Sequence, residues 1–229
     1  MNPENPEKPP RSRLAVFGDM LLLALFAVAV GALAYRYLAP APRTPTQPAP
    51  ARRDDRPTVD AGKMRALVRE TPPGEILPVW TPPKLSARWR YIIVHHSATN
   101  GGNGRQFDRW HRQRGMENGM AYHFVITNGQ GKENGPDGQV EIGRRWLEQL
   151  DGGHVRGDAL NHEAIGVCLV GNFLHQMPTP KQIASCKALI KHLRALTGIP
   201  ASAVISHQKA PRQATVCPGC LPVELLTAE

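Results

Sequence analysis

Residues 90–99 read Arg-Tyr-Ile-Ile-Val-His-His-Ser-Ala-Thr, an apolar and largely β-branched run that ends in polar side chains. A short run of this kind predicts a buried strand. His95 and His96 stand near its end. Because neighbouring side chains of a strand point to opposite faces, only one of the two can enter a given pocket. The run therefore predicts a buried strand that carries one candidate functional histidine.

The chain after this run continues with further strand and helix patterns. Four more apolar runs predict strands at residues 121–127, 140–142, 164–170 and 204–206. A short basic helix around Phe107 ends at Gly115. The clearest helix spans residues 180–197, where Thr179 can cap the first turn and Gln182 completes a capping box. Strands that alternate with helices predict an α/β fold, with a single mixed central β-sheet flanked by helices on both faces.

The composition divides the 229-residue chain into two parts. Fifteen of the 22 prolines precede residue 85, whereas all nine histidines and all four cysteines follow it. The first part therefore has the composition of a spacer, and the second holds every good nitrogen or sulfur ligand for a metal. The net charge of +9 suggests an anionic partner. Nucleic acid is not expected, because the arginines of residues 105–114 are typical of a solvated helix face.

The N-terminal residues predict a transmembrane anchor or a signal peptide. Residues 14–38 form an apolar stretch, interrupted by Asp19 near its beginning, that reaches the ~20 residues needed to cross a bilayer. One interpretation is a single-pass anchor with residues 1–13 as a cytoplasmic tail, which carries positive charge before the stretch. The other is a cleavable signal peptide, because Ala32-Leu33-Ala34 is a small-x-small site. Either interpretation places the rest of the chain outside the cytoplasm.

Residues 39–84 are expected to form a Pro-rich linker. Their Ala-Pro repeats favour polyproline II and oppose a packed core. A short helix can interrupt the linker around Met64, Leu67 and Val68, which form a weak apolar edge. The globular domain then occupies residues 85–229.

Three candidate metal ligands lie far apart in the sequence. His95 ends the first predicted strand, His207 follows the last one, and Cys217 lies ten residues further on in Thr-Val-Cys-Pro-Gly. Two imidazoles, one thiolate and a water make up a tetrahedral catalytic zinc site with an open coordination position. Spacing alone leaves the ordinary alternative open, because a lone histidine is more often a surface or hydrogen-bonded core residue.

Four segments resemble the type 2 N-acetylmuramoyl-L-alanine amidase family, which includes peptidoglycan recognition proteins and phage lysozyme-type amidases. They are residues 92–99 (Ile-Ile-Val-His-His-Ser-Ala-Thr), 121–126 (Ala-Tyr-His-Phe-Val-Ile), 161–173 and 207–219, in the family's order. The resemblance implies that His95, His207 and Cys217 bind one zinc ion. It also implies that Tyr122 is catalytic and that Thr215 occupies a position that is lysine or threonine in active relatives.

Two further polar residues resemble family positions near the substrate groove. We expect His154 and Asn161 to contact substrate, with a purely structural role in the loop as the alternative. His111 and His123 are expected to support packing or to hydrogen-bond site residues. The other histidines are expected at the surface: His162, His175 and His192.

Three cysteines fall outside the predicted metal site. Cys168 on a predicted buried strand and Cys186 on the apolar face of the long helix can be core thiols or, in an oxidising compartment, a disulfide. Cys220 lies three residues after Cys217, and a disulfide between these two would remove the thiolate and the metal with it. The sequence leaves these alternatives open.

With the resemblance, these residues predict a zinc-dependent peptidoglycan hydrolase that uses metal-activated water to cleave the amide between N-acetylmuramic acid and L-alanine. The alternative is a peptidoglycan-binding module of the same fold that does not cut, although binding-only members typically lose the zinc cysteine and this chain retains Cys217. The expected partners are peptidoglycan or muropeptides and a membrane, with no nucleic acid and with a monomeric catalytic domain. The expected location is the bacterial inner membrane, with the catalytic domain on the extracytoplasmic side.

Overall fold

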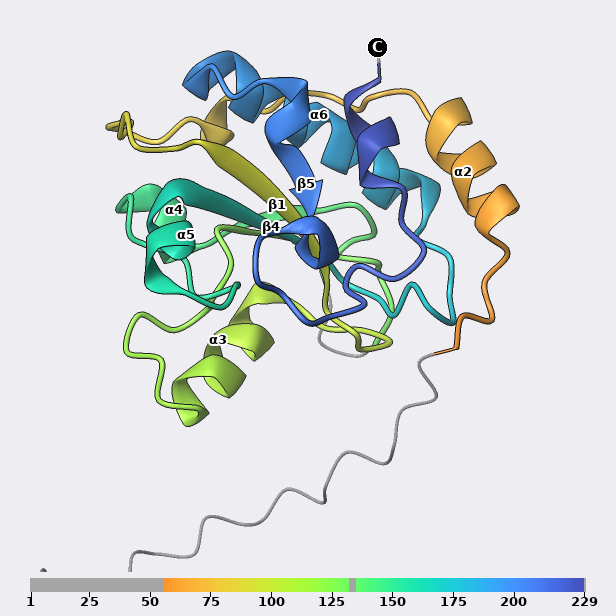
Figure 1. Cartoon of the computed structure of the whole chain (residues 1–229), viewed down its shortest axis with the longest axis horizontal. Coiled ribbons are helices and arrows are strands. Elements are labelled where there is room, and N and C mark those ends of the chain that lie inside the picture. The colour runs from red at the N-terminus through yellow and green to blue at the C-terminus, as the bar shows by residue number, and fades with distance from the viewer. Residues whose placement is uncertain (1–55, 132–134, 229) are drawn as a thin grey trace, which may run out of the picture. The chain divides into compact units, whose positions relative to one another are not determined.

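A five-stranded sheet forms the centre of the computed structural model, which describes residues 56–131 and 135–228 (Figure 1). The strand order is β3-β2-β4-β1-β5; β3 is antiparallel to β2, and every other pair is parallel. The strands are β1 (Tyr91–His96), β2 (Phe124–Ile126), β3 (Val140–Ile142), β4 (Ala164–Leu169) and β5 (Val204–Ser206). The predicted mixed sheet is confirmed. The carboxyl ends of its four parallel strands meet at one edge, where open α/β sheets place their ligands.

Helices and short 3₁₀ turns connect the strands and cover the sheet (Figure 1). The helices are α2 (Ala61–Glu70), α3 (Gly104–Gln113), α4 (Arg144–Leu147), α5 (Asp158–Glu163) and α6 (Pro180–Thr197). The 3₁₀ turns cover Pro78–Trp80, Ala201–Ala203, His207–Lys209 and Val223–Thr227.

Side-chain alternation directs the two faces of the sheet into different cores. Ile92 of β1 and Phe124 of β2 point to the side where α2 and α6 complete the main core. Val125 of β2 and its register partner Cys168 of β4 point to the other side and pack with Phe107 of α3. Helices therefore cover both faces, as the sequence predicts.

α6 begins and ends at the predicted residues. Thr179 Oγ1 accepts a hydrogen bond from the Gln182 N–H (3.0 Å), and Gln182 Oε1 accepts one from the Thr179 N–H (3.2 Å), which completes the capping box. Gly198 follows with a φ of 74°, a left-handed conformation that glycine adopts without steric cost. The buried Gln182 also donates through Nε2 to the carbonyls of Ile126 (3.0 Å) and Val170 (2.9 Å). These bonds tie the start of α6 to the carboxyl ends of β2 and β4.

Residues 56–84 belong to the folded domain, which corrects the expected linker. α2 lies where the short helix is predicted, but its Met64 and Val68 are fully buried in the main core. Trp80 is 2% exposed, and its carbonyl oxygen accepts a hydrogen bond from Trp146 Nε1–H over 2.8 Å. The sequence predicts helix α2 but not its burial, because the core that covers it is formed by residues far away in the sequence. The domain therefore starts before residue 85.

The predicted anchor or signal segment, residues 14–38, and the first part of the linker, residues 39–55, lie outside the described residues. Within residues 56–131 and 135–228, no helix combines the length and the apolar character that crossing a membrane requires. The N-terminal segment therefore stays a prediction.

All four cysteines are free thiols. Cys168 lies on the α3 side of the sheet, whereas Cys186 lies in the main core on the α6 side. The sheet separates these two side chains, so the disulfide alternative for Cys168 and Cys186 is wrong. Cys220 packs against the main core and is not paired with Cys217.

Candidate metal centre

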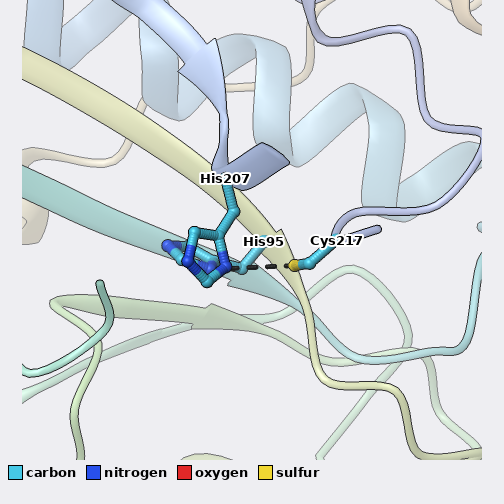
Figure 2. Close-up of side chains that lie close together, drawn as sticks. All are labelled: His95, His207 and Cys217. Atoms are coloured by element: carbon cyan, nitrogen blue, oxygen red, sulfur yellow. Dashed lines mark hydrogen bonds between the residues drawn. The ribbon is translucent and has the colours of Figure 1, made fainter. Parts of the chain in front are cut away.

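The three candidate metal ligands converge at the carboxyl ends of β1 and β5 (Figure 2). His95 is on β1, His207 immediately follows β5, and Cys217 comes from the C-terminal loop. One candidate ligand atom from each residue lies within 4.8 Å of the other two. Because β1 and β5 are parallel neighbours, the sheet itself brings the two imidazoles together, with ring centroids 4.4 Å apart.

His96 points to the opposite face, as strand alternation predicts. Its Nδ1 accepts a hydrogen bond from the Phe173 N–H (3.0 Å), and the two rings lie 5.8 Å apart. Its backbone N–H donates to Cys217 Sγ over 3.3 Å. His96 therefore holds the ligand loop through its backbone, while its ring packs towards the main core.

Burial controls the protonation of the candidate ligand atoms. His95 is 1% exposed, and burial together with the nearby His154 and His207 lowers its pKa well below the usual value, so its ring is neutral. Burial also raises the pKa of the Cys217 thiol to about 12, and its Sγ lies 3.8 Å from His95 Nδ1. Neutral imidazoles are ready to coordinate, whereas the thiol needs a nearby cation to lose its proton. This set of two nitrogens and one sulfur fits zinc.

Two side chains of the C-terminal loop support the ligands. Thr215 Oγ1 accepts a hydrogen bond from the Cys217 N–H (3.1 Å), so the structure places Thr215 in the ligand loop. Its catalytic role stays a prediction. Gln213 Oε1 lies 3.1 Å from His207 Nε2. Sequence reasoning missed Gln213, because no motif marks a glutamine in this loop.

Tyr122 lies beside the metal centre because β2 begins three residues later than predicted. The strand starts at Phe124. Just before it, the His123 N–H donates to the Gly166 carbonyl over 2.9 Å. The Gly166 N–H donates to the His123 ring at Nδ1 over 3.0 Å, so a side chain accepts the hydrogen bond that a backbone carbonyl would accept in a continued strand. In a longer strand, alternation would turn Tyr122 to the same side as Phe124. Instead its ring lies 5.2 Å from the ring of His95.

The phenol of Tyr122 keeps its proton at neutral pH. Burial, with the nearby thiols of Cys168 and Cys217, raises its pKa well above the usual value. A protonated phenol beside the metal centre is a hydrogen-bond donor and not a base.

His154 and Asn161, the two predicted substrate contacts, are both buried. They lie at the loop of residues 152–157. Asn161 Oδ1 accepts hydrogen bonds from the N–H groups of His154 (3.0 Å) and Val155 (3.2 Å). Its Nδ2 donates to the carbonyls of Val155 (2.8 Å) and Gly157 (3.2 Å). Both ring nitrogens of His154 also have protein partners. The geometry gives both residues a structural role, and their contact with substrate stays a prediction.

His123 and His111 support the packing around the site, as predicted. His123 is fully buried, and its Nε2 donates to the Leu150 carbonyl over 3.1 Å. His111 Nδ1 accepts from the Ala121 N–H (3.0 Å) and so fixes the backbone just before Tyr122. The remaining histidines are exposed or partly exposed: His162, His175 and His192.

Comparison with known proteins identifies relatives over the part of the chain that carries the centre. A family model described as N-acetylmuramoyl-L-alanine amidase matches residues 85–220, more than half of the chain. The endolysin of Escherichia phage T7 is 36% identical over 112 residues, which cover 45% of this chain and 66% of the endolysin. The endolysin of Enterobacteria phage T3 is 36% identical over 120 residues, which cover 49% of this chain and 71% of the endolysin. The matches thus span about two thirds of each endolysin.

A solved structure supports the same relationship. The N-acetylmuramoyl-L-alanine amidase LysC from Clostridium intestinale is 31% identical with a TM-score of 0.52, over 63% of this chain and 88% of that chain. Fold, candidate ligands and sequence similarity therefore agree over residues 85–220. The chain belongs to the N-acetylmuramoyl-L-alanine amidase family.

Proposed function

We propose that this protein is a zinc-dependent peptidoglycan hydrolase that cleaves the amide between N-acetylmuramic acid and L-alanine. The observation that carries the proposal is the convergence of His95, His207 and Cys217 beside Tyr122 at the carboxyl edge of the sheet. The family match and the similarity to two phage endolysins support peptidoglycan as the substrate.

The residues of the centre have chemistry that suits this reaction. His95, His207 and Cys217 would hold the ion. A zinc ion bound there supplies a Lewis acid that polarises the amide carbonyl and makes water nucleophilic at neutral pH. Tyr122 can donate a hydrogen bond to the oxygen on which negative charge develops, because its raised pKa preserves the phenolic proton. The Thr215 hydroxyl can orient water or substrate, but it is a poor base at neutral pH.

Metal removal and replacement test the proposal. The purified full-length chain is incubated with peptidoglycan, and newly exposed L-alanine amino termini on the stem peptides are measured. A chelator should abolish their release, and zinc should restore it. Cys217→Ser should lose both zinc and activity. Cys220→Ser is the matched control, because it replaces a thiol that packs against the main core instead of the metal centre, and it should retain both.

Tyr122→Phe separates catalysis from metal binding. Loss of one donor to a developing oxyanion typically lowers kcat about 10²–10³-fold, and we expect this loss with unchanged zinc content. Unchanged turnover would contradict the role of the phenol. A wild-type chain that binds zinc and muropeptides but releases no amino termini would identify a binding module in place of an enzyme.

We also propose that the domain works outside the cytoplasm. The support is the apolar stretch of residues 14–38, which has the composition of an anchor or a signal peptide. If the segment is an anchor, protease added to intact bacterial spheroplasts should digest the membrane-associated domain. If the segment is a cleaved signal peptide, the domain should appear in the periplasmic or secreted fraction. Protection of the domain together with cytoplasmic fractionation would contradict this placement.

A further inference from the structure

Hydrogen bonds around His95 determine which of its ring nitrogens is free. His154 Nε2 lies 3.2 Å from the Ala164 carbonyl oxygen. A carbonyl oxygen only accepts, so this Nε2 carries the proton. Burial lowers the pKa of His154 to about 4, so the ring is neutral at pH 7 and its Nδ1 is an acceptor. That Nδ1 lies 3.0 Å from His95 Nε2, which must therefore donate. The proton of His95 sits on Nε2, so its lone pair is on Nδ1, which lies 3.8 Å from Cys217 Sγ.

A similar argument applies to His207. The amide of Gln213 is oriented by the backbone, because its Nε2 donates to the carbonyls of Arg156 (3.0 Å) and Pro211 (2.9 Å). Its Oε1 accepts from the Arg156 N–H (2.9 Å) and is 3.1 Å from His207 Nε2. An amide oxygen only accepts, so His207 Nε2 donates. Burial lowers the pKa of His207, so its ring is neutral at pH 7 and its lone pair is also on Nδ1.

Two glycines make room for the ring of His154. A Cβ at Gly166 of β4 would lie 2.4 Å from His154 Cδ2, and a Cβ at Gly152 would lie 2.5 Å from the same atom. Carbon atoms prefer separations of about 3.5–4.0 Å, so neither position has space for a side chain. Asn161 fixes the backbone N–H of His154 as well. The fold therefore holds this ring in one place.

We propose that His154 and Gln213 are positioning residues that keep His95 and His207 in the tautomer whose Nδ1 lone pair would be available to bind the metal. The inference rests on the proposed function, because it takes both imidazoles as zinc ligands. The loop of residues 152–157 links the two ligands: His154 belongs to it, and Gln213 is bonded to the backbone of its Arg156. Such partners fix the orientation of a ligand imidazole and raise its basicity, and their loss typically costs about 10–100-fold in metal affinity.

Zinc affinity of the full-length chain, measured by competition with a chromophoric chelator, tests the inference. His154→Ala and Gln213→Ala should each weaken zinc binding about 10–100-fold. His154→Asn keeps an acceptor for the imidazole N–H of His95, so it should recover most of the affinity. The control His192→Asn removes an imidazole on α6 that contacts Thr81 and Trp80. It should leave zinc affinity unchanged.

Imidazole ¹⁵N NMR of the metal-free chain reads the tautomers directly. The wild type should show Nε2–H on both His95 and His207, and each alanine variant should lose this preference at the ring it contacts. Nδ1–H on either wild-type ring, or alanine variants with wild-type affinity, overturns the positioning roles. A wild-type chain with Nε2–H on both rings that fails to bind zinc overturns the proposed function instead.

Discussion

Replacing Gly166 with alanine should disturb the metal centre without changing any ligand. The new Cβ would lie 2.4 Å from Cδ2 of His154 and 2.7 Å from both Cγ and Nε2 of the same ring. Contact at about 3.5 Å requires the ring to move by about 1 Å. The hydrogen bond between His154 Nδ1 and His95 Nε2 is 3.0 Å long, and a displacement of this size can take it beyond the usual limit.

The Gly166→Ala substitution should have two measurable costs. Forcing a methyl group into a filled core typically costs about 1–3 kcal/mol in the free energy of unfolding. At about 2–4 °C per kcal/mol for a domain of this size, the Tm should fall by roughly 2–12 °C. Weakening the contact to His95 should also lower zinc affinity about 10-fold or more.

Thermal unfolding of the metal-free chain and chelator competition measure these two effects separately. Gly153→Ala is the matched control in the adjacent loop, because its Cβ would meet its nearest atoms at an ordinary 3.5 Å. Combining Gly166→Ala with His154→Ala should cost less than the sum of the two, because removing the ring leaves space for the methyl group. A Gly166→Ala chain that melts and binds zinc like the wild type would refute the reasoning.

Three further predictions concern stability. Met64→Ala should lower the free energy of unfolding in urea by about 2–5 kcal/mol, because it opens a cavity in the main core. A loss under about 0.5 kcal/mol is typical of a surface site and would contradict the assignment of α2 to the domain. Thr179→Ala should cost about 0.5–2 kcal/mol by the same measurement, because α6 loses its N-cap, and Thr179→Ser should cost much less. Equal losses would contradict the capping role. Burial lowers the pKa of His123 well below 6.5, so the unfolded chain takes up the proton first. This contribution to stability is present above pH 6.5 and falls by about 1.4 kcal/mol per pH unit below it, until the folded-state pKa is reached. His123→Asn should therefore reduce the acid sensitivity of the metal-free domain, and an unchanged pH profile would contradict this.

Local signals account for the parts of the fold that were predictable. The β-branched run that carries His95 and His96 forms β1, and the capping box of Thr179 and Gln182 marks the start of α6. Both features depend on neighbours a few residues apart, so they can be read from a single sequence. The candidate ligands were found through a motif resemblance, because His95, His207 and Cys217 meet only in three dimensions.

Non-local contacts account for what sequence reasoning missed. The side to which Tyr122 points depends on the hydrogen bonds between His123 and Gly166, which end the strand early. The role of Gln213 depends on its bonds to the distant Arg156. Of these residues, only Gly166 could have been recognised from the sequence, because a glycine within an apolar strand often marks the close approach of another group.

The burial of α2 matters for anyone who trims this protein for crystallisation or engineering. A truncation at residue 85, where the family match begins, would remove Met64, Val68 and Trp80 from the main core. At about 1.5–3 kcal/mol for each large apolar side chain, the shortened protein would lose roughly 5–9 kcal/mol, comparable to the whole stability of many domains. It would also expose apolar side chains of the main core next to α6, which favours aggregation. A workable expression boundary lies at or before Arg56.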